Sequence, residues 1–242
     1  MKTKFTLFLV LSIAFAVESL PQEKKFFDAP FGGGGGYTPA WYFVNTDIVN
    51  EQLNLIGLPE IASDGLFSSG GGGFIYIGFV PFLRVGGMGY GGSSSVTAVI
   101  NGENKEVLFN IGGGGLTLEY TLPFLRDVAV SIGGIIGGGS LSIDTYSNNN
   151  SGSYQGFWND FKNGSTDNTS SSLHTSFWFV APTINIDIPL YRFVSFRIGG
   201  GYQVTLAEDW KIDNDIDISG PGDLNGNGLF IQSGIFIGFF SY

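Results

Sequence analysis

The chain has 242 residues, a formal net charge of −10, 39 glycines and no cysteine. A hydrophobic content of 43% is enough to bury the core of one domain, and the lack of cysteine excludes disulfides and cysteine-ligated metal centres. The glycines come in blocks, unlike those of a collagen, and the acidic balance argues against a nucleic-acid partner, because nucleic acids are bound through Lys and Arg.

The N-terminus has the features of a secretory signal peptide. Lys2 and Lys4 precede the apolar run 5–16, and small residues suited to cleavage follow it. A membrane-spanning helix would need about 20 apolar residues, and every later apolar run is interrupted by Gly, Pro or a charge. We expect residues 1–19 to direct export and residues 20–242 to form the mature domain.

A first strand is expected within residues 32–44, although glycines and Pro39 blur its pattern. Residues 45–57 then predict a short helix in the first loop. Asn45 or Thr46 can cap its start, several apolar residues share one face, and Gly57 ends it.

A Pro-x-x-Arg motif occurs three times, at 81–84, 123–126 and 189–192, and a glycine pair follows each Arg after seven residues. Proline fits a turn or a strand end better than the middle of a strand. The flanking residues alternate between apolar and polar, as in 116–122 and 183–188, which is typical of strands. Each repeat therefore predicts a β-hairpin. Three hairpins, the first strand and a last strand over 229–242 make eight strands.

The short turns alternate with longer polar connections at 93–106, 146–172 and 211–228, and the first of these centres on Asn101-Gly102, a hairpin-turn pair. Short turns on one side and long loops on the other are typical of transmembrane barrels, and strands of about 10 residues can cross a bilayer. The predicted fold is all-β, an eight-stranded antiparallel up-and-down transmembrane β-barrel with one short helix in the first loop. A soluble exported β-sheet protein is the alternative.

The signal peptide, the eight strands, the short turns and the C-terminal Phe239-Phe240-Ser241-Tyr242 resemble small bacterial outer-membrane β-barrels of the outer-membrane-protein-A type. The resemblance covers roughly residues 32–242. It implies a location in the bacterial outer membrane, contact with outer-membrane lipid and lipopolysaccharide, and recognition of Tyr242 by the barrel-assembly machinery. It implies no catalytic residues, and we expect a monomer.

Glu119, Asp187 and Arg197 lie on the strand faces opposite Leu, Ile and Val. We predict that they form a charge network in the lumen, in which each charge offsets the cost of burying the others. The arginines of the three motifs, Arg84, Arg126 and Arg192, are predicted to anchor the turns at the periplasmic interface.

The strands at which the barrel closes, which we call the seam, suggest a second hypothesis. If Val80 faces lipid, the alternation points Ile75, Ile77 and Phe79 into the lumen, and the same rule applied to Tyr242 points Ile235, Ile237 and Phe239 inward. One side of the lumen would then be apolar. This favours a carrier of a small apolar ligand or lipid, unless the helix at 45–57 plugs the lumen.

Asp223, Asn225 and Asn227 match the first half of a calcium loop, and Asp213 and Asp215 can supply further carboxylates. The bidentate Glu of such a loop is missing, because Gly234 stands at its position. A polar loop built on Asx turns is the alternative. We expect no cofactor apart from a weak Ca²⁺ site.

His174 and Ser176 share one strand face, which resembles the placement of His and Ser in outer-membrane lipid A deacylases. No motif positions a carboxylate to orient the histidine, as such an enzyme needs, so we predict no catalysis. Phe157, Trp158 and Phe161 in the longest loop are a candidate binding surface. The alternative is that they fold back onto the rim of the barrel. The predicted role is therefore structural or surface-interacting, through the loops at 146–172 and 211–228.

Overall fold

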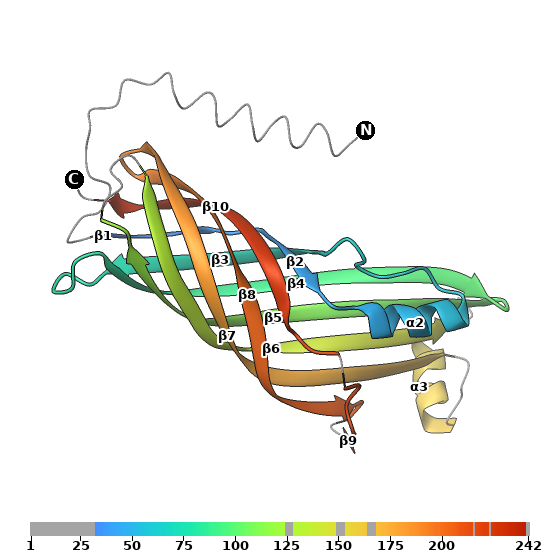
Figure 1. Cartoon of the computed structure of the whole chain (residues 1–242). Helices are drawn as coiled ribbons and strands as arrows, with labels where there is room; N and C mark the ends of the chain where they lie inside the picture. The colour runs from blue at the N-terminus through green and yellow to red at the C-terminus, as the bar shows by residue number, and fades with distance from the viewer. Residues whose placement is uncertain are drawn as a thin grey trace.

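The computed structural model describes residues 32–123, 128–148, 153–163, 168–214, 216–222 and 224–240. Within them, antiparallel strands close into a ring, with two short helices near one end (Figure 1). The predicted signal peptide, Arg126, Asp215, Asp223 and Tyr242 lie outside the described residues.

The ring contains eight strands. Its members are β1 (Gly32–Tyr37) with β2 (Ala40–Val44), β3 (Leu66–Tyr76), β4 (Leu83–Ile100), β5 (Glu103–Thr121), β6 (Ala129–Asn148), β7 (Thr169–Tyr191), β8 (Val194–Ile212) and β10 (Gly228–Phe240). The two-residue strand β9 (Ile216–Asp217) pairs only with β8 and is not counted in the ring. Both β1 and β2 lie between β10 and β3, so they are two parts of one barrel strand. All pairs are antiparallel, and the predicted fold class is confirmed.

The break between β1 and β2 falls at Thr38 and Pro39, where the sequence predicted an interruption. Proline has no N–H to donate to a sheet ladder. The ladder continues around it, because Thr38 N donates to Gly70 O at 2.8 Å and Ser233 N donates to Pro39 O at 3.0 Å. The closing strand therefore pairs with both of its neighbours despite the proline.

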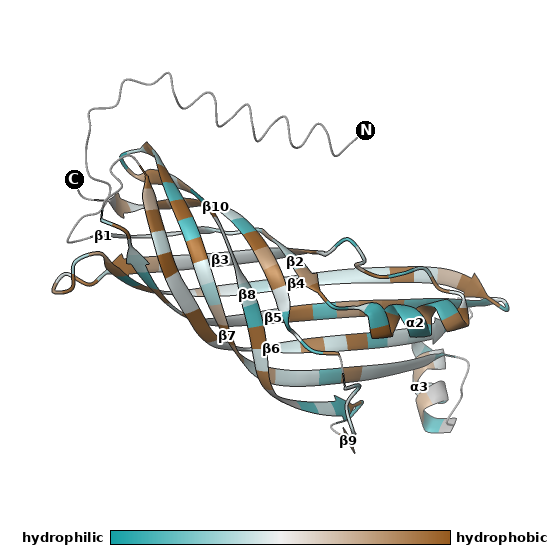
Figure 2. Ribbon diagram, in the orientation of Figure 1, coloured by the Kyte–Doolittle hydropathy of each residue, from teal (hydrophilic) through white to brown (hydrophobic). Residues whose placement is uncertain are grey.

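Apolar side chains cover the outside of the ring and polar side chains line its interior, as the alternation predicted. Leu116 and Ile132 are 72% and 54% exposed, whereas Glu119, Ser131 and Thr183 are buried. Figure 2 shows the apolar residues spread along the strands of the wall. This is the arrangement of a transmembrane barrel, in which lipid replaces water outside.

The prediction that one side of the lumen is apolar is wrong. Ile75, Ile235, Ile237 and Phe239 are exposed on the outer face, and Ile77 and Phe79 lie in the connection after β3. On one side of the seam, β3 ends at Tyr76, so the alternation cannot be counted back from Val80 through the turn at 77–82. On the other side, β10 pairs with β8, whose inward side chains fix which residues of β10 face the lumen. Phe74, Tyr76 and Phe236 are the residues buried there.

The connection predicted at 93–106 is not a long loop. β4 and β5 run to a two-residue turn, Asn101-Gly102, whose φ values of 54° and 85° suit a tight hairpin. Strands β4 to β8 have 18 to 23 residues, about twice what a tilted strand needs to cross a bilayer. The wall formed by these strands therefore continues beyond the apolar outer surface that faces lipid, which we call the belt. We call the end of the barrel that these extensions form the long-loop end.

The helix predicted at 45–57 is present as α2 (Asp47–Ile56). Asn45 Oδ1 accepts a hydrogen bond from Asp47 N at 2.9 Å, and Gly57 ends the helix with φ 79°. Its buried Val49 and Leu53 belong to the same cluster as inward residues of the tall strands, including Phe109 and Leu141. In Figure 1, α2 lies along the extended ends of β4 to β6. It covers the lumen at the long-loop end.

Among the described residues, no helix is long and apolar enough to cross a membrane.

We predict that a charge on the belt destabilises the barrel. Ile132→Lys places an ammonium group on the lipid face and should lower the free energy of unfolding by about 2–4 kcal/mol. Val99→Lys, on the outer face of β4 next to the hairpin tip and 70% exposed, should change it by less than about 0.5 kcal/mol. Urea titration of both variants in lipid vesicles measures this, and an equal effect would contradict the position of the belt.

Candidate functional site

The strand register creates two pairs of opposite charges on the inner face. Arg84 of β4 lies directly opposite Glu119 of β5, and Asp187 of β7 lies directly opposite Arg197 of β8. Opposite charges at such positions stabilise neighbouring strands. Each pair forms within one antiparallel strand pair, and closure of the ring then brings the two pairs together across the lumen.

Arg197 is the centre of the resulting network. Its Nε and Nη2 donate to Asp187 at 2.6 and 3.0 Å, and its Nη1 and Nη2 donate to Glu119 at 3.0 and 3.1 Å. Arg84 Nη1 also donates to Asp187 and lies 3.8 Å from Glu119 Oε2. All four side chains are buried, and their charges sum to zero. The three residues predicted to meet do so.

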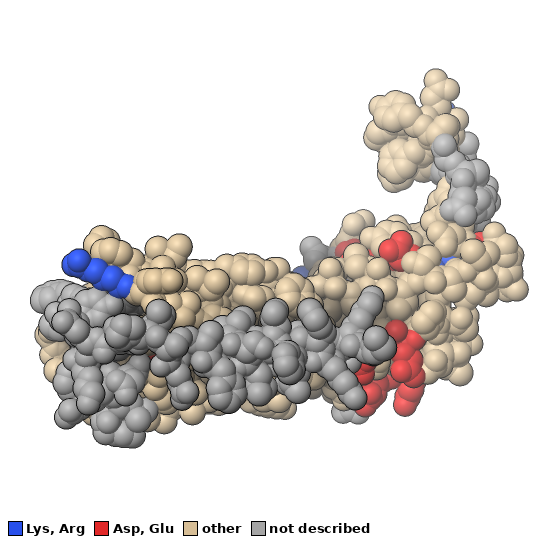
Figure 3. All heavy atoms as spheres, turned by 90° about the horizontal axis from the view of Figure 1, so that it is seen from above, with Lys and Arg blue, Asp and Glu red and all other residues tan. Residues whose placement is uncertain are grey.

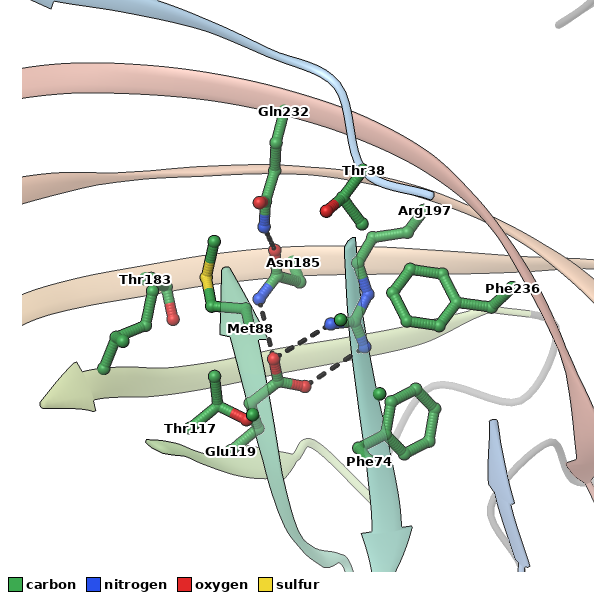
Figure 4. A pocket seen from close by; sticks show the side chains of 14 residues that line it. Thr38, Phe74, Met88, Thr117, Glu119, Thr183, Asn185, Arg197, Gln232 and Phe236 are labelled. Atoms are coloured by element: carbon green, nitrogen blue, oxygen red, sulfur yellow. Dashed lines mark hydrogen bonds and ion pairs between the residues drawn. The ribbon is translucent and has the colours of Figure 1, made fainter. Parts of the chain in front are cut away.

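Neutral polar side chains complete the network. Asn185 Nδ2 donates to Glu119 Oε1 at 3.1 Å, and Gln232 Nε2 donates to Asn185 Oδ1 at 2.9 Å (Figure 4). Ser131 Oγ donates to Glu119 Oε2 at 3.4 Å. These bonds matter because a buried carboxylate needs partners for its remaining lone pairs. They link β5, β6, β7 and β10.

Aromatic rings pack against both guanidinium groups. The Cζ of Arg84 lies 4.8 Å from the ring centre of Phe74 and 5.0 Å from that of Tyr76. The Cζ of Arg197 lies 5.1 Å from Phe74 and 4.7 Å from Phe236, as Figure 4 shows from close by. These distances are typical of cation–π contacts. The seam side of the lumen is thus lined by aromatic rings that pack against the two guanidinium groups.

Arg84 was predicted to anchor a turn at the membrane interface, and this is wrong. It is fully buried in the lumen, whereas Arg192 is exposed in the turn between β7 and β8 and packs over Phe193 at 5.1 Å. The two turns differ in length. Residues 77–82 separate β3 from β4, but only 192 and 193 separate β7 from β8. The same motif therefore places its arginine in a strand in one hairpin and in the turn in the other.

The lumen beside this network is almost filled. The cavity that borders Glu119, Asn185 and Arg197 measures about 20 Å³, compared with roughly 300–1,000 Å³ for typical small-molecule sites. Together with the outward position of Ile75 and Ile235, this removes the basis for the predicted apolar carrier site.

The residues of the predicted calcium loop use their oxygens locally. Asn227 Oδ1 accepts hydrogen bonds from Thr205 N and Oγ1 at 2.6 and 2.9 Å, and Asn225 Oδ1 accepts one from Asn227 N at 3.0 Å. Asp213 Oδ1 accepts hydrogen bonds from Ser172 N and Ser171 Oγ, both at 2.9 Å. Among the described residues, no three His, Asp or Glu side chains gather as a metal site. Ca²⁺ binding stays a prediction, since Asp215 and Asp223 lie outside these residues.

His174 and Ser176 lie on the outer face of the tall wall, beyond the apolar belt. His174 pairs with Ser142 and Lys211, and Ser176 pairs with Ser140 and Asp209 across the neighbouring strands. The absence of catalysis stays a prediction.

The longest loop contains a helix that the sequence analysis did not predict. α3 (Tyr154–Asn163) starts where Ser153 Oγ accepts a hydrogen bond from Gly156 N at 2.9 Å. Its aromatic residues recur at helical spacing, which is the signal that could have revealed the helix. These residues, Tyr154, Phe157, Trp158 and Phe161, are between 53% and 81% exposed. The predicted surface aromatics are therefore exposed and share one helix face.

No protein-family model and no curated protein matches this sequence. Several solved structures resemble it. Ail, the attachment invasion locus protein of Yersinia pestis, aligns over 86% of this chain and 99% of its own, with 9% identity and a TM-score of 0.42. Neisserial surface protein A aligns over 86% of this chain and 97% of its own, with 10% identity and a TM-score of 0.46. OprG from Pseudomonas aeruginosa aligns over 91% of this chain and 100% of its own, with 12% identity and a TM-score of 0.46.

Breaking the network should cost much more than removing an exposed arginine. Arg197→Met leaves Glu119 and Asp187 buried with fewer partners and should lower the free energy of unfolding by about 3–5 kcal/mol. Arg192→Met, at the exposed turn, should change it by less than about 0.5 kcal/mol. Denaturant titration of both variants in vesicles compares their free energies of unfolding. Similar losses for the two variants would show that the network adds nothing to stability.

Gly199 leaves room for the network. A Cβ at this position would overlap Asn185 Oδ1 and lie 2.7 Å from Ile184 O. Gly199→Ala should therefore displace Asn185 from Glu119 and destabilise the barrel by about 1–3 kcal/mol. Gly91→Ala is the control, because nothing lies within 4 Å of its added Cβ. The same titration measures both, and a neutral Gly199→Ala would contradict the close fit.

Proposed function

We propose that this protein is an integral bacterial outer-membrane barrel that recognises a partner at the cell surface through its long-loop end, without catalysis. In this proposal the short turns face the periplasm and the long-loop end faces outward, which is the usual orientation of such barrels. Outer-membrane lipid and lipopolysaccharide surround the belt.

The single observation that carries the proposal is the exposed aromatic face of α3. Large exposed apolar patches are uncommon on proteins that have no partner, and Tyr, Trp and Phe are enriched at the energetic centres of interfaces. Phe157 packs against Trp158 with ring centres 5.1 Å apart, and Tyr154 lies 6.5 Å from Trp158. The rings thus contact one another and remain available to a partner.

The lumen supports an anchoring role for the barrel itself. Its four charges are engaged in ion pairs, and the cavity beside them has room for about one water molecule. Recognition is therefore assigned to the surface of the long-loop end.

Single cysteines test both the location and the orientation, because the chain has none of its own. Asn159→Cys in α3 and Phe79→Cys in a short turn are both at exposed positions. A membrane-impermeant maleimide should label Asn159→Cys on intact cells and Phe79→Cys only after lysis, in a protein that fractionates with the outer membrane. Recovery in the soluble fraction, or labelling of Phe79→Cys on intact cells, would contradict the proposal.

A further inference from the structure

The aromatic face of α3 lies outside the membrane belt. On β7 the last aromatic residue of the belt is Trp178, and the strand begins nine residues earlier at Thr169, a distance of about 30 Å along an extended strand. The outward side chains between them are polar, including His174 and Ser176. Because this polar stretch separates α3 from the belt, bilayer lipid does not account for its aromatic face.

The long-loop end is strongly acidic. The described residues 45–65, 91–114, 139–148, 153–163, 169–177 and 207–222 contain twelve Asp and Glu residues apart from Asp215, but only three lysines and no arginine. Figure 3 shows acidic side chains gathered at this end of the molecule. Such a surface attracts cations and repels anionic partners. It also repels a second copy of itself.

Three carboxylates lie at the long-loop ends of the strands, Asp144 near the end of β6, which precedes α3, Glu103 at the start of β5, and Asp213 directly after β8. Asp144 accepts a hydrogen bond from Ser172 Oγ at 2.6 Å, Glu103 accepts one from Ser147 Oγ at 2.9 Å, and Asp213 is held by Ser171 and Ser172. The backbone hydrogen bond from Ser172 holds the pKa of Asp213 below its usual range, with further contributions from Ser171 and the nearby His174. Asp213 therefore stays ionised at neutral pH.

We propose that α3 and the carboxylates of the long-loop end form a docking surface for a basic protein segment rich in Lys and Arg. This inference rests on the proposed surface role and adds the chemistry of the partner. Arginine and lysine stack on Trp, Tyr and Phe through cation–π contacts, and the carboxylates of the long-loop end pair with the remaining cations. The exposed aromatic rings of α3 and the acidic surface of the same end both suit a cationic ligand.

The test measures binding of a short fluorescent peptide rich in Lys and Arg to the barrel in uncharged detergent micelles, by anisotropy. A peptide with Glu at the cationic positions is the matched probe. The basic peptide should bind and the acidic one should not. Trp158→Ala combined with Phe161→Ala should weaken binding about tenfold or more, and Asp144→Asn combined with Asp213→Asn should weaken it and reduce its salt dependence. Phe79→Ala, an exposed aromatic in a short turn, should leave it unchanged.

The double aromatic variant should keep the heat-modifiable, folded form, because both side chains lie outside the core. Equal affinity of this variant and the parent protein for the basic peptide would overturn the proposal, as would equal binding of the acidic peptide. Self-association through α3, or binding of α3 to vesicles of anionic lipid in place of the peptide, would overturn it as well. The maleimide experiment is independent of these outcomes, so a surface-exposed α3 that does not bind the basic peptide would refute only the partner chemistry.

Discussion

Four ionised side chains meet inside the ring, and their mutual satisfaction is the constraint on which the rest of the barrel depends. Burying one charge costs several kcal/mol, and only close, hydrogen-bonded partners offset this cost. Arg84 with Glu119, and Asp187 with Arg197, are cross-strand neighbours, and contact between the two pairs requires a closed ring. A slip of one residue in any of these strands would turn a charge out toward lipid. The network therefore favours one register.

The seam is built around the same charges. The rings of Phe74, Tyr76 and Phe236 cover the two guanidinium groups, so the inner wall is aromatic where the outer wall carries Ile75 and Ile235. The first strand contributes little side-chain volume here, because β1 is glycine apart from Tyr37. Glycine permits close approach of neighbouring backbones, and Gly35 pairs with Gly73, which in turn pairs with Gly87. Backbone ladders and lumen side chains, more than outward packing, hold the closing strand.

The strands differ in length, and this difference places the part of the barrel that lies in the membrane apart from the part proposed to bind a partner. The tall strands β4 to β8 extend beyond the belt, α2 packs its apolar side onto their inner face, and α3 follows the end of β6. Val49 and Leu53 of α2 are thus buried by the protein itself, although Leu55 and Ile56 stay exposed, whereas all four aromatic residues of α3 are exposed. A difference of this kind between two short helices in one chain points to an external partner for the second helix, and the acidic surroundings restrict its charge.

The sequence by itself determined the number and order of the barrel strands, the helix at 45–57, the inverted faces and the inward position of Glu119, Asp187 and Arg197, because period-two alternation and capping residues are local signals. It did not determine the lengths of β4 to β8, whose outer ends were predicted as loops. It did not determine Arg84 or the seam. The inward or outward position of a residue beyond a turn depends on the length of that turn, and identical Pro-x-x-Arg motifs lead into turns of different length. Ile75 and Ile235 were misplaced for the same reason, since pairing with β4 and β8 fixes their faces. Only the tertiary structure decided these points, because closure of the ring aligns strands that lie far apart in the chain.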